Sequence, residues 1–430
     1  MTKATKVVCL GGGYVAMHLV KSMKKAINKG IIELTIIDKN NYHTFHGLIA
    51  EMLGGQLQPG QIASPSRRLF KPARFHNAII EDIDIKNKRI ITFREFDNKQ
   101  FEVQFDHLVV SLGVVDDLSR YPGIAEHTFR LKNYWDCFEV RNHIIHMLEL
   151  AEIETDPIER KRLLNFVIVG GNYAGVEVAT ELPSLFKKIR TEFPGLGSDE
   201  ITINLIHSGS SILPELNSRY PKLVRGASKL IARQSNLKII LNTRIKSATR
   251  DEAVFEDGSK IQTRTIISCT GNAQSPLLEK LGLKKDKSNR LATDPYGNVI
   301  NHKNIWAGGD CAAVPMKDGG TAPPLAIFAM TVGSLLGKNI VNSIQKKPLE
   351  KYRFSGLGDA ASLGNRKAVG HIKGIPLLGF SAWIVWRIFM LIYLPTWDRR
   401  LRALSDWLLW PIIGRDIFYR GTKGGIRSIK

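Results

Sequence analysis

A strand that runs into a glycine turn near the start of the chain constrains the fold most. Val7–Leu10 is apolar, glycines follow it, and a helix-forming segment extends from Met17 to Lys29. Gly11 permits a sharp turn, Gly13 lets the backbone approach a pyrophosphate, and Ala16 keeps helix and strand close. Free N–H groups at the helix N-terminus would then face the phosphates. The stretch predicts a dinucleotide-binding βαβ unit.

An acidic residue in the right place supports this interpretation. Glu33–Ile37 is typical of a second strand, and it ends on Asp38, whose carboxylate would accept hydrogen bonds from ribose hydroxyls. Tyr14 and Val15 in the turn and Lys39 after the acid are predicted to border the same nucleotide. The alternative is an ordinary strand–turn–helix of an α/β domain.

The chain repeats this unit. The apolar strand Phe166–Val169 runs into a second turn, whose three pattern positions hold Gly170, Asn172 and Gly175. The next strand, Ile201–Ile206, ends on His207, where the first unit ends on an acid. Two dinucleotide units in one chain suggest a flavin nucleotide in one and a nicotinamide nucleotide in the other, which is an arrangement for electron transfer.

Other strands also end on glycines. Leu108–Val110 closes at Gly113, and a strand over 265–269 ends in Gly271. Residues 304–307 form a short strand that leads to Gly308, Gly309 and Asp310, and a helix from about Ala326 to Ile344 follows. Alternating runs over 78–105 predict a small antiparallel sheet, and a helix is expected from Asn133 to about Ile153.

The charge of the chain is strongly positive, with a formal net charge of +21. Residues 371–430 contain ten Lys or Arg against three Asp, together with five of the seven tryptophans. Basic charge mixed with Trp in an apolar segment favours a membrane surface over nucleic acid. The four cysteines have no disulfide or zinc-ligand spacing, so no metal site is predicted and a reducing compartment fits best. Without a secretory leader before the first strand, the expected location is the cytoplasmic face of the cell membrane.

The C-terminal segment has a composition of its own. Residues 375–397 are apolar apart from Arg387, yet Pro376, Gly379 and Pro395 leave room for a helix of only about sixteen residues, short of the roughly twenty that span a bilayer. Residues 399–410 set basic side chains against Leu and Trp, as in a helix that lies in the interface. Two in-plane membrane helices are therefore predicted, and the alternative is a domain-packing face or the interface of a homodimer.

The predicted fold class is α/β, with two Rossmann-like dinucleotide-binding domains, the second inserted in the first, and a C-terminal amphipathic helical membrane-binding segment. Residues 1–115 and 290–345 are expected to bind FAD, residues 116–289 NAD(P)H, and residues 346–430 the membrane.

These motifs together resemble the two-dinucleotide-binding flavoproteins related to disulfide reductases. Within that family the chain is most similar to the type II NADH dehydrogenases, membrane-bound NADH:quinone oxidoreductases that pump no protons. The similarity runs nearly end to end, through the stretches VVCLGGGYVA, FDHLVVSLG, YPGIAEHTFRLK, FVIVGGNYAGVE, NIWAGGDCA and the tail GFSAWIVWRIFMLIYLP…GRDI. Paired cysteines invite comparison with sulfide:quinone oxidoreductases, but Cys9 and Cys269 lie on apolar strands and Cys311 follows Asp310, which favours core roles.

The resemblance implies a role for each site residue. The expected FAD-binding residues are Gly11, Gly13, Tyr14, Val15, Ala16, Asp38, Lys39, Gly113, Asp310 and Ala326. The expected NAD(P)H-binding residues are Gly170, Asn172, Gly175, His207 and Gly271. Glu177 is expected near the nicotinamide ring as the catalytic residue, and the expected quinone contacts are Pro324, Ile327 and Phe328.

Three positions depart from the family pattern. Asn172 replaces the middle glycine of the second turn, so its side chain is expected in the space of the pyrophosphate, with NADH displaced or weakened. His207 replaces the acid that would reject a 2′-phosphate, and serines follow it, which makes NADPH a candidate donor. Ile327 replaces a glutamine beside the quinone and leaves an apolar slot.

Three functions follow from the sequence. The first is a monotopic NAD(P)H:quinone oxidoreductase with FAD. The second is a membrane-anchored flavoprotein of the same fold whose donor is not a nicotinamide nucleotide, and the third is a nucleotide sensor or scaffold without catalysis.

Overall fold

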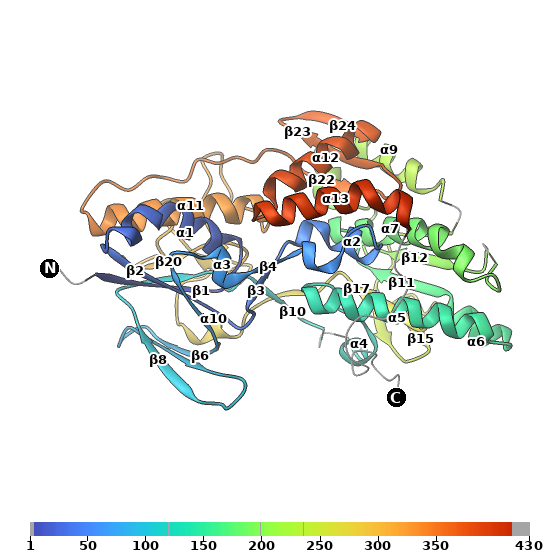
Figure 1. Ribbon diagram of the computed structural model, residues 1–430, viewed down its shortest axis with the longest axis horizontal. Helices are drawn as coiled ribbons and strands as arrows, with labels where there is room; N and C mark the ends of the chain where they lie inside the picture. The colour runs from blue at the N-terminus through green and yellow to red at the C-terminus, as the bar shows by residue number, and fades with distance from the viewer. Residues whose placement is uncertain (1–3, 119–120, 198, 235, 415–430) are drawn as a thin grey trace. The chain divides into compact units, whose positions relative to one another are not determined.

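The computed structural model describes residues 4–118, 121–197, 199–234 and 236–414 (Figure 1). They form two compact units. Unit 1 comprises the residues up to 43 with 64–115 and 272–356, and unit 2 comprises 44–63, 116–271 and the residues from 357 on. The chain leaves unit 1 and returns to it, which confirms the predicted insertion of one Rossmann-like domain in another.

The elements of unit 1, in chain order, are β1 (Thr5–Leu10), α1 (Tyr14–Asn28), β2 (Ile32–Asp38), α3 (Ser66–Leu69), β5 (Arg74–Asn77), β6 (Ile79–Asp84), β7 (Arg89–Phe93), β8 (Gln100–Gln104), β9 (His107–Val110), β18 (Asn272–Gln274), α10 (Leu277–Lys280), β19 (Leu291–Ala292), β20 (Ile305–Ala307), β21 (Ala312–Ala313) and α11 (Ala326–Ile344). Three short strands span a boundary between the units: β3 (Tyr42–Thr44), β4 (Ala63–Pro65) and β10 (Val114–Asp116).

The elements of unit 2 are η1 (His46–Leu48), α2 (Ile49–Leu53), η2 (Pro59–Gln61), α4 (Ile124–His127), α5 (Tyr134–Ile153), α6 (Pro157–Leu163), β11 (Asn165–Val169), α7 (Tyr173–Ile189), η3 (Arg190–Glu192), β12 (Thr202–Ile206), α8 (Pro214–Arg219), α9 (Pro221–Ile231), β13 (Leu237–Ile240), β14 (Ile245–Ala248), β15 (Glu252–Phe255), β16 (Lys260–Gln262), β17 (Thr265–Ser268), β22 (Ala360–Ser362), β23 (Ala368–Ile372), β24 (Ile375–Gly379), α12 (Phe380–Tyr393) and α13 (Trp397–Ile413).

A parallel sheet in the order β20-β9-β1-β2-β5 forms the centre of unit 1. Strand β1 is buried on both faces, as expected of a continuous apolar run in a covered parallel sheet. Helices α1 and α11 lie side by side (Figure 1). They approach so closely at Gly333 that any side chain there would collide with the backbone of Val15. The predicted antiparallel sheet over 78–105 is confirmed as β6-β7-β8.

A second parallel sheet, in the order β13-β12-β11-β17, forms the centre of unit 2. The predicted helix before it is confirmed as α5, which starts after Asn133 because that side chain and Asp136 make a capping box. Strand β11 pairs with β12 in the same register in which β1 pairs with β2, so Val169 faces Ile206 as Leu10 faces Ile37. The two glycine turns therefore leave their sheets at equivalent points.

The units differ from the sequence-based domain boundaries in three places. Residues 44–63, which were expected in the FAD-binding domain, belong to unit 2. The chain returns to unit 1 at 272 rather than at 290, because β18 and α10 follow directly and α10 packs on β6. The C-terminal residues from 357 on do not form a region of their own, since β22 packs on α7, strands β23 and β24 pack on α9, and α13 packs on η2.

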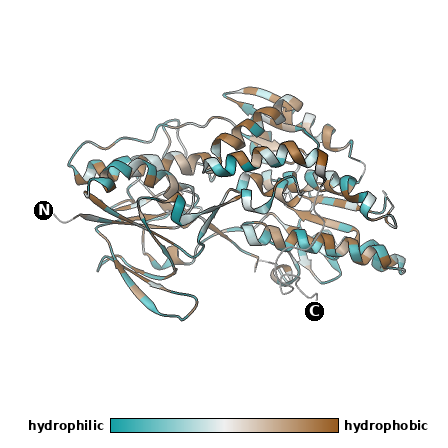
Figure 2. Ribbon diagram, viewed as in Figure 1, coloured by the Kyte–Doolittle hydropathy of each residue, from teal (hydrophilic) through white to brown (hydrophobic). Residues whose placement is uncertain are grey.

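The C-terminal segment contains the two helices that the sequence predicted, and a strand precedes them. Ile375–Gly379 forms β24, the edge strand of an antiparallel sheet with β22 and β23. Pro376 and Gly379 explain this, since neither favours a helix interior. Helices α12 and α13 follow, with 14 and 17 residues. Helix α12 is largely apolar, whereas α13 mixes apolar and charged residues (Figure 2).

Arg387 attaches these helices to residues 44–63 of the same unit. Its guanidinium donates to Glu51 Oε1 at 2.7 Å and to Gln56 Oε1 at 2.6 Å, and it stacks on the rings of Trp383 and Trp407. The indole of Trp407 donates to the other oxygen of Glu51 at 2.8 Å. Arg387 is therefore a buried, paired charge inside the protein. Removing one partner of such a pair costs about 3–5 kcal/mol.

Within the described residues, α11 alone is a helix long and apolar enough to cross a membrane. More than half of it is buried, because it packs on α1 in the core of unit 1.

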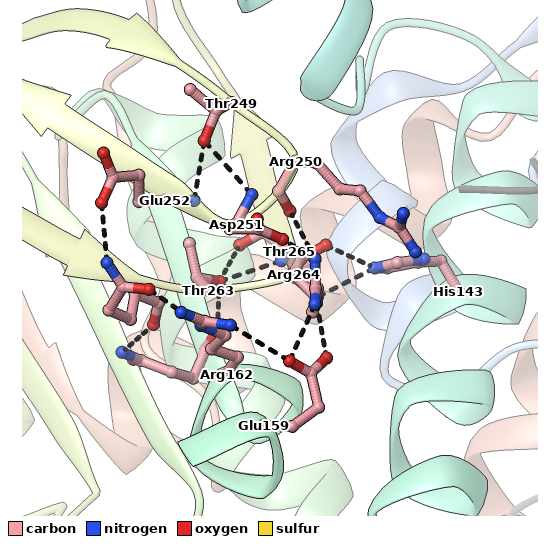
Figure 3. A network of polar contacts seen from close by, with 12 residues as sticks. His143, Glu159, Arg162, Thr249, Arg250, Asp251, Glu252, Thr263, Arg264 and Thr265 are labelled. Carbon is pink, nitrogen blue, oxygen red and sulfur yellow. Dashed lines mark hydrogen bonds and ion pairs between the residues drawn. The ribbon is translucent and has the colours of Figure 1, made fainter. Parts of the chain in front are cut away.

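A network of ion pairs fastens α6 to the strands beside it (Figure 3). Arg264 donates to both oxygens of Glu159, at 2.7 and 2.8 Å, and also contacts Asp251. The side chains of Arg264 and Glu159 are 12% and 23% exposed, so solvent screens their pair only in part. These hydrogen bonds hold the pKa of Glu159 below its usual range.

Glu159→Gln should lower the free energy of unfolding of unit 2 by about 1–3 kcal/mol at neutral pH. Because the folded-state pKa is lowered, the ionised carboxylate stabilises above its unfolded pKa of about 4.3, and this contribution is lost as the pH falls through the folded value. Urea unfolding should therefore separate variant and wild type at pH 7 and much less below about pH 4. Glu102→Gln, at an exposed pair with Arg89, should change stability by less than about 0.5 kcal/mol. A loss for Glu159→Gln that is independent of pH would contradict this role.

Candidate functional site

The first glycine turn, Gly11–Ala16, contains two glycines with different requirements. Gly11 has φ +100°, and a side chain there would collide with the carbonyl oxygen of Ser111. Gly13 has an ordinary φ of −83°, and a Cβ there would meet no atom within 4 Å. Neither conformation nor packing explains Gly13, so the space in front of it fits a group that approaches the backbone.

Asp38 closes this turn from the next strand. Its Oδ2 accepts from the N–H of Gly12 at 2.6 Å, and its Oδ1 accepts from the N–H of Asn40 at 2.7 Å. Burial raises the pKa of Asp38, although both hydrogen bonds favour the carboxylate. Lys39 beside it is exposed.

The turn after β20 lies against the same helix end. Gly309 has φ +78°, and a Cβ there would meet Val15 at 3.1 Å and Ala329 of α11 at 3.9 Å. Gln274 donates to the carbonyl oxygen of Asp310 at 3.3 Å. Unit 1 thus brings together four of the segments expected around FAD: the first glycine turn, Asp38, Asp310 and the start of α11 at Ala326.

The three cysteines compared with catalytic ones are buried or half-buried. Burial raises the pKa of Cys9 and Cys269 to about 12 and that of Cys311 to about 11. Such thiols stay protonated and poorly nucleophilic, as expected of core residues.

The candidate quinone residues precede or begin α11. Pro324 is exposed, Ile327 is half-buried, and Phe328 is buried in the core of unit 1, with its ring 5.2 Å from that of Phe354. Gly113 follows β9 with φ +64°, and a Cβ there would meet open space.

Asn172 occupies in the second turn the place that Gly13 has in the first, with nearly the same backbone angles, φ −78° and ψ −174°. Its carboxamide is folded back on the chain: Oδ1 accepts from the N–H of Gly175 at 3.0 Å, and Nδ2 donates to the carbonyl of Cys269 at 2.7 Å. The side chain therefore caps α7. The sequence had led us to expect it in the space of the pyrophosphate instead.

His207 lies where the first unit has its acid. Its Nδ1 accepts from the N–H of Gly171 at 3.2 Å, the same bond that Asp38 makes with Gly12. Burial lowers the pKa of His207, which keeps the ring neutral.

A cavity of about 160 Å³ opens at the carboxyl ends of the strands of unit 2. Its lining includes the predicted residues Gly170, His207 and Gly271. Ligands of open parallel sheets bind at this edge. The lining also includes Thr243 and Arg244, which sequence reasoning missed because β13, the strand before them, was not recognised there.

Glu177 lies on α7, one turn beyond the second glycine turn. The N–H of Ser362 donates to its Oε1 at 3.0 Å, which favours the carboxylate. Desolvation outweighs this bond and raises the pKa of Glu177 to about 8. The carboxyl therefore keeps its proton at neutral pH. No local signal marks Ser362, since it comes from a distant part of the sequence.

Comparison with known proteins agrees with this architecture. The sequence profile of the pyridine nucleotide-disulphide oxidoreductase family matches residues 5–333. A probable NADH dehydrogenase of Dictyostelium discoideum is 28% identical over 96% of this chain and 90% of that protein. The type II NADH:quinone oxidoreductase NdhA of Mycobacterium tuberculosis is 25% identical over 94% of this chain and 86% of its own.

Among solved structures, NDH2 from Plasmodium falciparum in complex with NADH has the same fold. It superposes with a TM-score of 0.88 at 17% identity, over 96% of this chain and 99% of that one. The chain belongs to the pyridine nucleotide-disulphide oxidoreductase family and, within it, to the type II NADH dehydrogenases.

Proposed function

We propose that this protein is a membrane-associated NAD(P)H:quinone oxidoreductase that uses FAD and pumps no protons. The observation that carries the proposal is the pair of equivalent glycine turns, one in each unit, each closed by a side chain that accepts the N–H of its second residue. Relatives of nearly full length are named NADH:quinone oxidoreductases, which supports both the donor and the acceptor.

FAD would bind in unit 1. Gly13 leaves room for its pyrophosphate at the start of α1, Asp38 would accept from the ribose, and Asp310 and Ala326 would border the remainder. When bound, FAD takes two electrons from the nicotinamide nucleotide and passes them to the quinone. Tyr14, Lys39 and Gly113 would complete the contacts, and the buried Val15 and Ala16 would support the turn from the core.

The nicotinamide nucleotide would bind in unit 2, along the second glycine turn and the cavity beside His207 and Gly271. Glu177 would face the nicotinamide end and hold a proton there at neutral pH. The quinone would meet Pro324 and Ile327 at the start of α11, with Phe328 supporting them from the core.

The exposed apolar face of β24, α12 and α13 would contact the membrane. This face, which we call the tail face, consists of the exposed side chains of Ile375, Leu378, Phe380, Ile384, Ile388, Ile392, Trp397, Leu401, Leu404, Leu408, Leu409 and Ile412. The opposite faces of the two helices are buried through Ala382, Trp386 and Ala403. Helices with one apolar exposed face and basic residues such as Arg400 and Arg402 suit an anionic bilayer surface, here the cytoplasmic face of the cell membrane. Arg399 is mostly buried beside Asp398. A homodimer interface is the alternative use of the same face.

Replacing Trp397, Leu408 and Ile412 by Ser should move the protein from the membrane pellet to the supernatant, with flavin still bound. The three side chains are 74%, 65% and 82% exposed, so their loss should leave the packing intact. Burying one such side chain in the interface contributes roughly 1.5–3 kcal/mol, so membrane affinity should fall more than 100-fold. The control is Ile153→Ser with Ile158→Ser, exposed on α5 and α6 away from the tail face. If this variant still sediments with the membrane but no longer forms dimers, the tail face serves self-association and not membrane binding.

Steady-state assays of the purified protein test the proposed activity. Oxidation of NADH or NADPH should require a quinone, and the flavin released by denaturation should have the mass of FAD. Release of FMN, or oxidation of NADH and NADPH at the same rate with and without a quinone, would overturn the proposal.

A further inference from the structure

We propose that the cavity at the ends of β12 and β13 binds the 2′-phosphate of NADPH, so that NADPH and not NADH is the preferred donor. The inference rests on the proposed function, because it requires a nicotinamide nucleotide in the second glycine turn. The donors proposed to hold this phosphate are His207, Ser208 and Arg244, three of the polar residues that line the cavity.

The tautomer of His207, a residue of the cavity lining, makes its second ring nitrogen a hydrogen-bond donor. The N–H of Gly171 can only donate, so Nδ1 of His207, 3.2 Å away, must offer its lone pair. The proton of the neutral ring is then on Nε2. Asp38 in the first unit accepts the equivalent backbone N–H but remains an anion, which accepts from ribose hydroxyls and repels a phosphate. The second unit therefore has a hydrogen-bond donor, His207, where the first unit has the acceptor Asp38.

Arg244 supplies a positive charge next to this donor. Strands β12 and β13 are adjacent and parallel, with Ile206 opposite Ile240, and the N–H of Thr243 donates to the carbonyl of His207 at 3.0 Å. Arg244 therefore follows directly on a residue fixed to His207. A hydrogen bond with Tyr121 raises the pKa of Arg244, and its planar guanidinium suits a phosphate.

Two acidic residues near the cavity leave room for the phosphate. Glu256 lies 3.7 Å from Nε of Arg244, but the two side chains are 57% and 47% exposed, so solvent screens their pair and a bound phosphate can replace it. Asp117 lines the cavity on another side, where its N–H donates to the carbonyl of Gly271 after β17. Strand β11 separates β17 from β12, so the backbone of Asp117 is fixed two strands away from the strand that ends at His207.

The test uses the flavin-loaded full chain and two readouts. The first is calorimetric binding of adenosine 2′,5′-bisphosphate against adenosine 5′-monophosphate, which differ only in the 2′-phosphate. The wild type should bind the bisphosphate at least about tenfold more tightly, and Arg244→Gln should remove most of this difference. The second is kcat/KM, which should fall about 10- to 100-fold for NADPH in Arg244→Gln and less than about threefold for NADH.

Two further variants sharpen the result. His207→Glu should reverse the preference toward NADH, since a carboxylate accepts from the 2′-hydroxyl and repels the phosphate. Arg225→Gln on α9 removes the same charge from an exposed side chain that does not line the cavity, and it should leave both nucleotides unaffected.

The outcomes separate the inference from the function on which it rests. Normal turnover with NADH, together with equal binding of the two adenosine phosphates, would overturn the 2′-phosphate site and leave the proposed function intact. Equal losses for NADH and NADPH in Arg244→Gln would also overturn it. If neither nucleotide reduces the flavin, the proposed function itself fails.

Discussion

Gly13→Val should give a folded protein that has lost its flavin. Position 13 has an extended backbone that any residue can adopt, and a Cβ there meets no atom of the chain within 4 Å. The side chain would instead fill the space in front of the N-terminus of α1, where a pyrophosphate must approach. We expect the ratio of flavin to protein to fall from near one to below about 0.1, with an unchanged circular dichroism spectrum.

Two other glycines are the controls for this result. Gly11→Val requires a side chain at φ +100° and a collision with Ser111, so it should lower the yield of folded protein. Gly60→Val, where a Cβ would meet only Arg399 at 3.7 Å, should remain yellow. A fully yellow Gly13→Val protein would contradict the assignment of FAD to the first glycine turn.

Glu177→Gln should slow quinone reduction about 10- to 100-fold and leave ferricyanide reduction nearly unchanged. A quinone takes up two electrons and two protons, whereas ferricyanide takes up electrons only. Desolvation raises the pKa of Glu177 to about 8, so at pH 7 it holds a proton that it can give up during turnover. Glutamine has the same shape and accepts from Ser362 as well, but it has no acidic proton.

The pH profile separates this role from a structural one. In the wild type the quinone rate should decline as the pH rises through about 8, because the folded-state pKa is raised and the proton is lost there. The variant should lack this decline, and the ferricyanide rate should show none in either protein. Equal losses with both acceptors would indicate that Glu177 only supports the fold or the nucleotide site.

Local patterns in the sequence were enough for the two Rossmann-like units. The glycine turns, the buried strands and the acid at Asp38 are consecutive in the chain, and the helix expected over 326–344 has the same bounds as α11. Asn133 likewise marks the start of α5, because capping depends on residues three positions apart.

Long-range contacts explain most of what the sequence did not reveal. Nothing near Arg387 indicates that its partner is Glu51, more than 300 residues earlier, so the attachment of the tail to residues 44–63 was not predicted. Ile375–Gly379 is apolar enough for either a helix or a strand, and pairing with β23 decides for the strand. Ser362 reaches Glu177 from a distant segment in the same way.

At the second glycine turn, the sequence shows that residue 172 is Asn but not which way its side chain points. A side chain at the middle position can point into the phosphate space or back onto the helix, and only the structure shows the bonds to Gly175 and Cys269. Arg244 was missed for a similar reason, because its nearness to His207 depends on the pairing of β12 with β13.

Anaerobic titration of the purified flavoprotein tests the proposed electron transfer most directly. An equimolar amount of NADPH, or a larger amount of the more weakly bound NADH, should bleach the visible flavin absorbance. An equimolar amount of a short-chain quinone should then restore it. Dithionite provides the fully bleached reference. Flavin that dithionite bleaches but that neither nicotinamide nucleotide reduces, or reduced flavin that the quinone does not reoxidise, would contradict the proposed function.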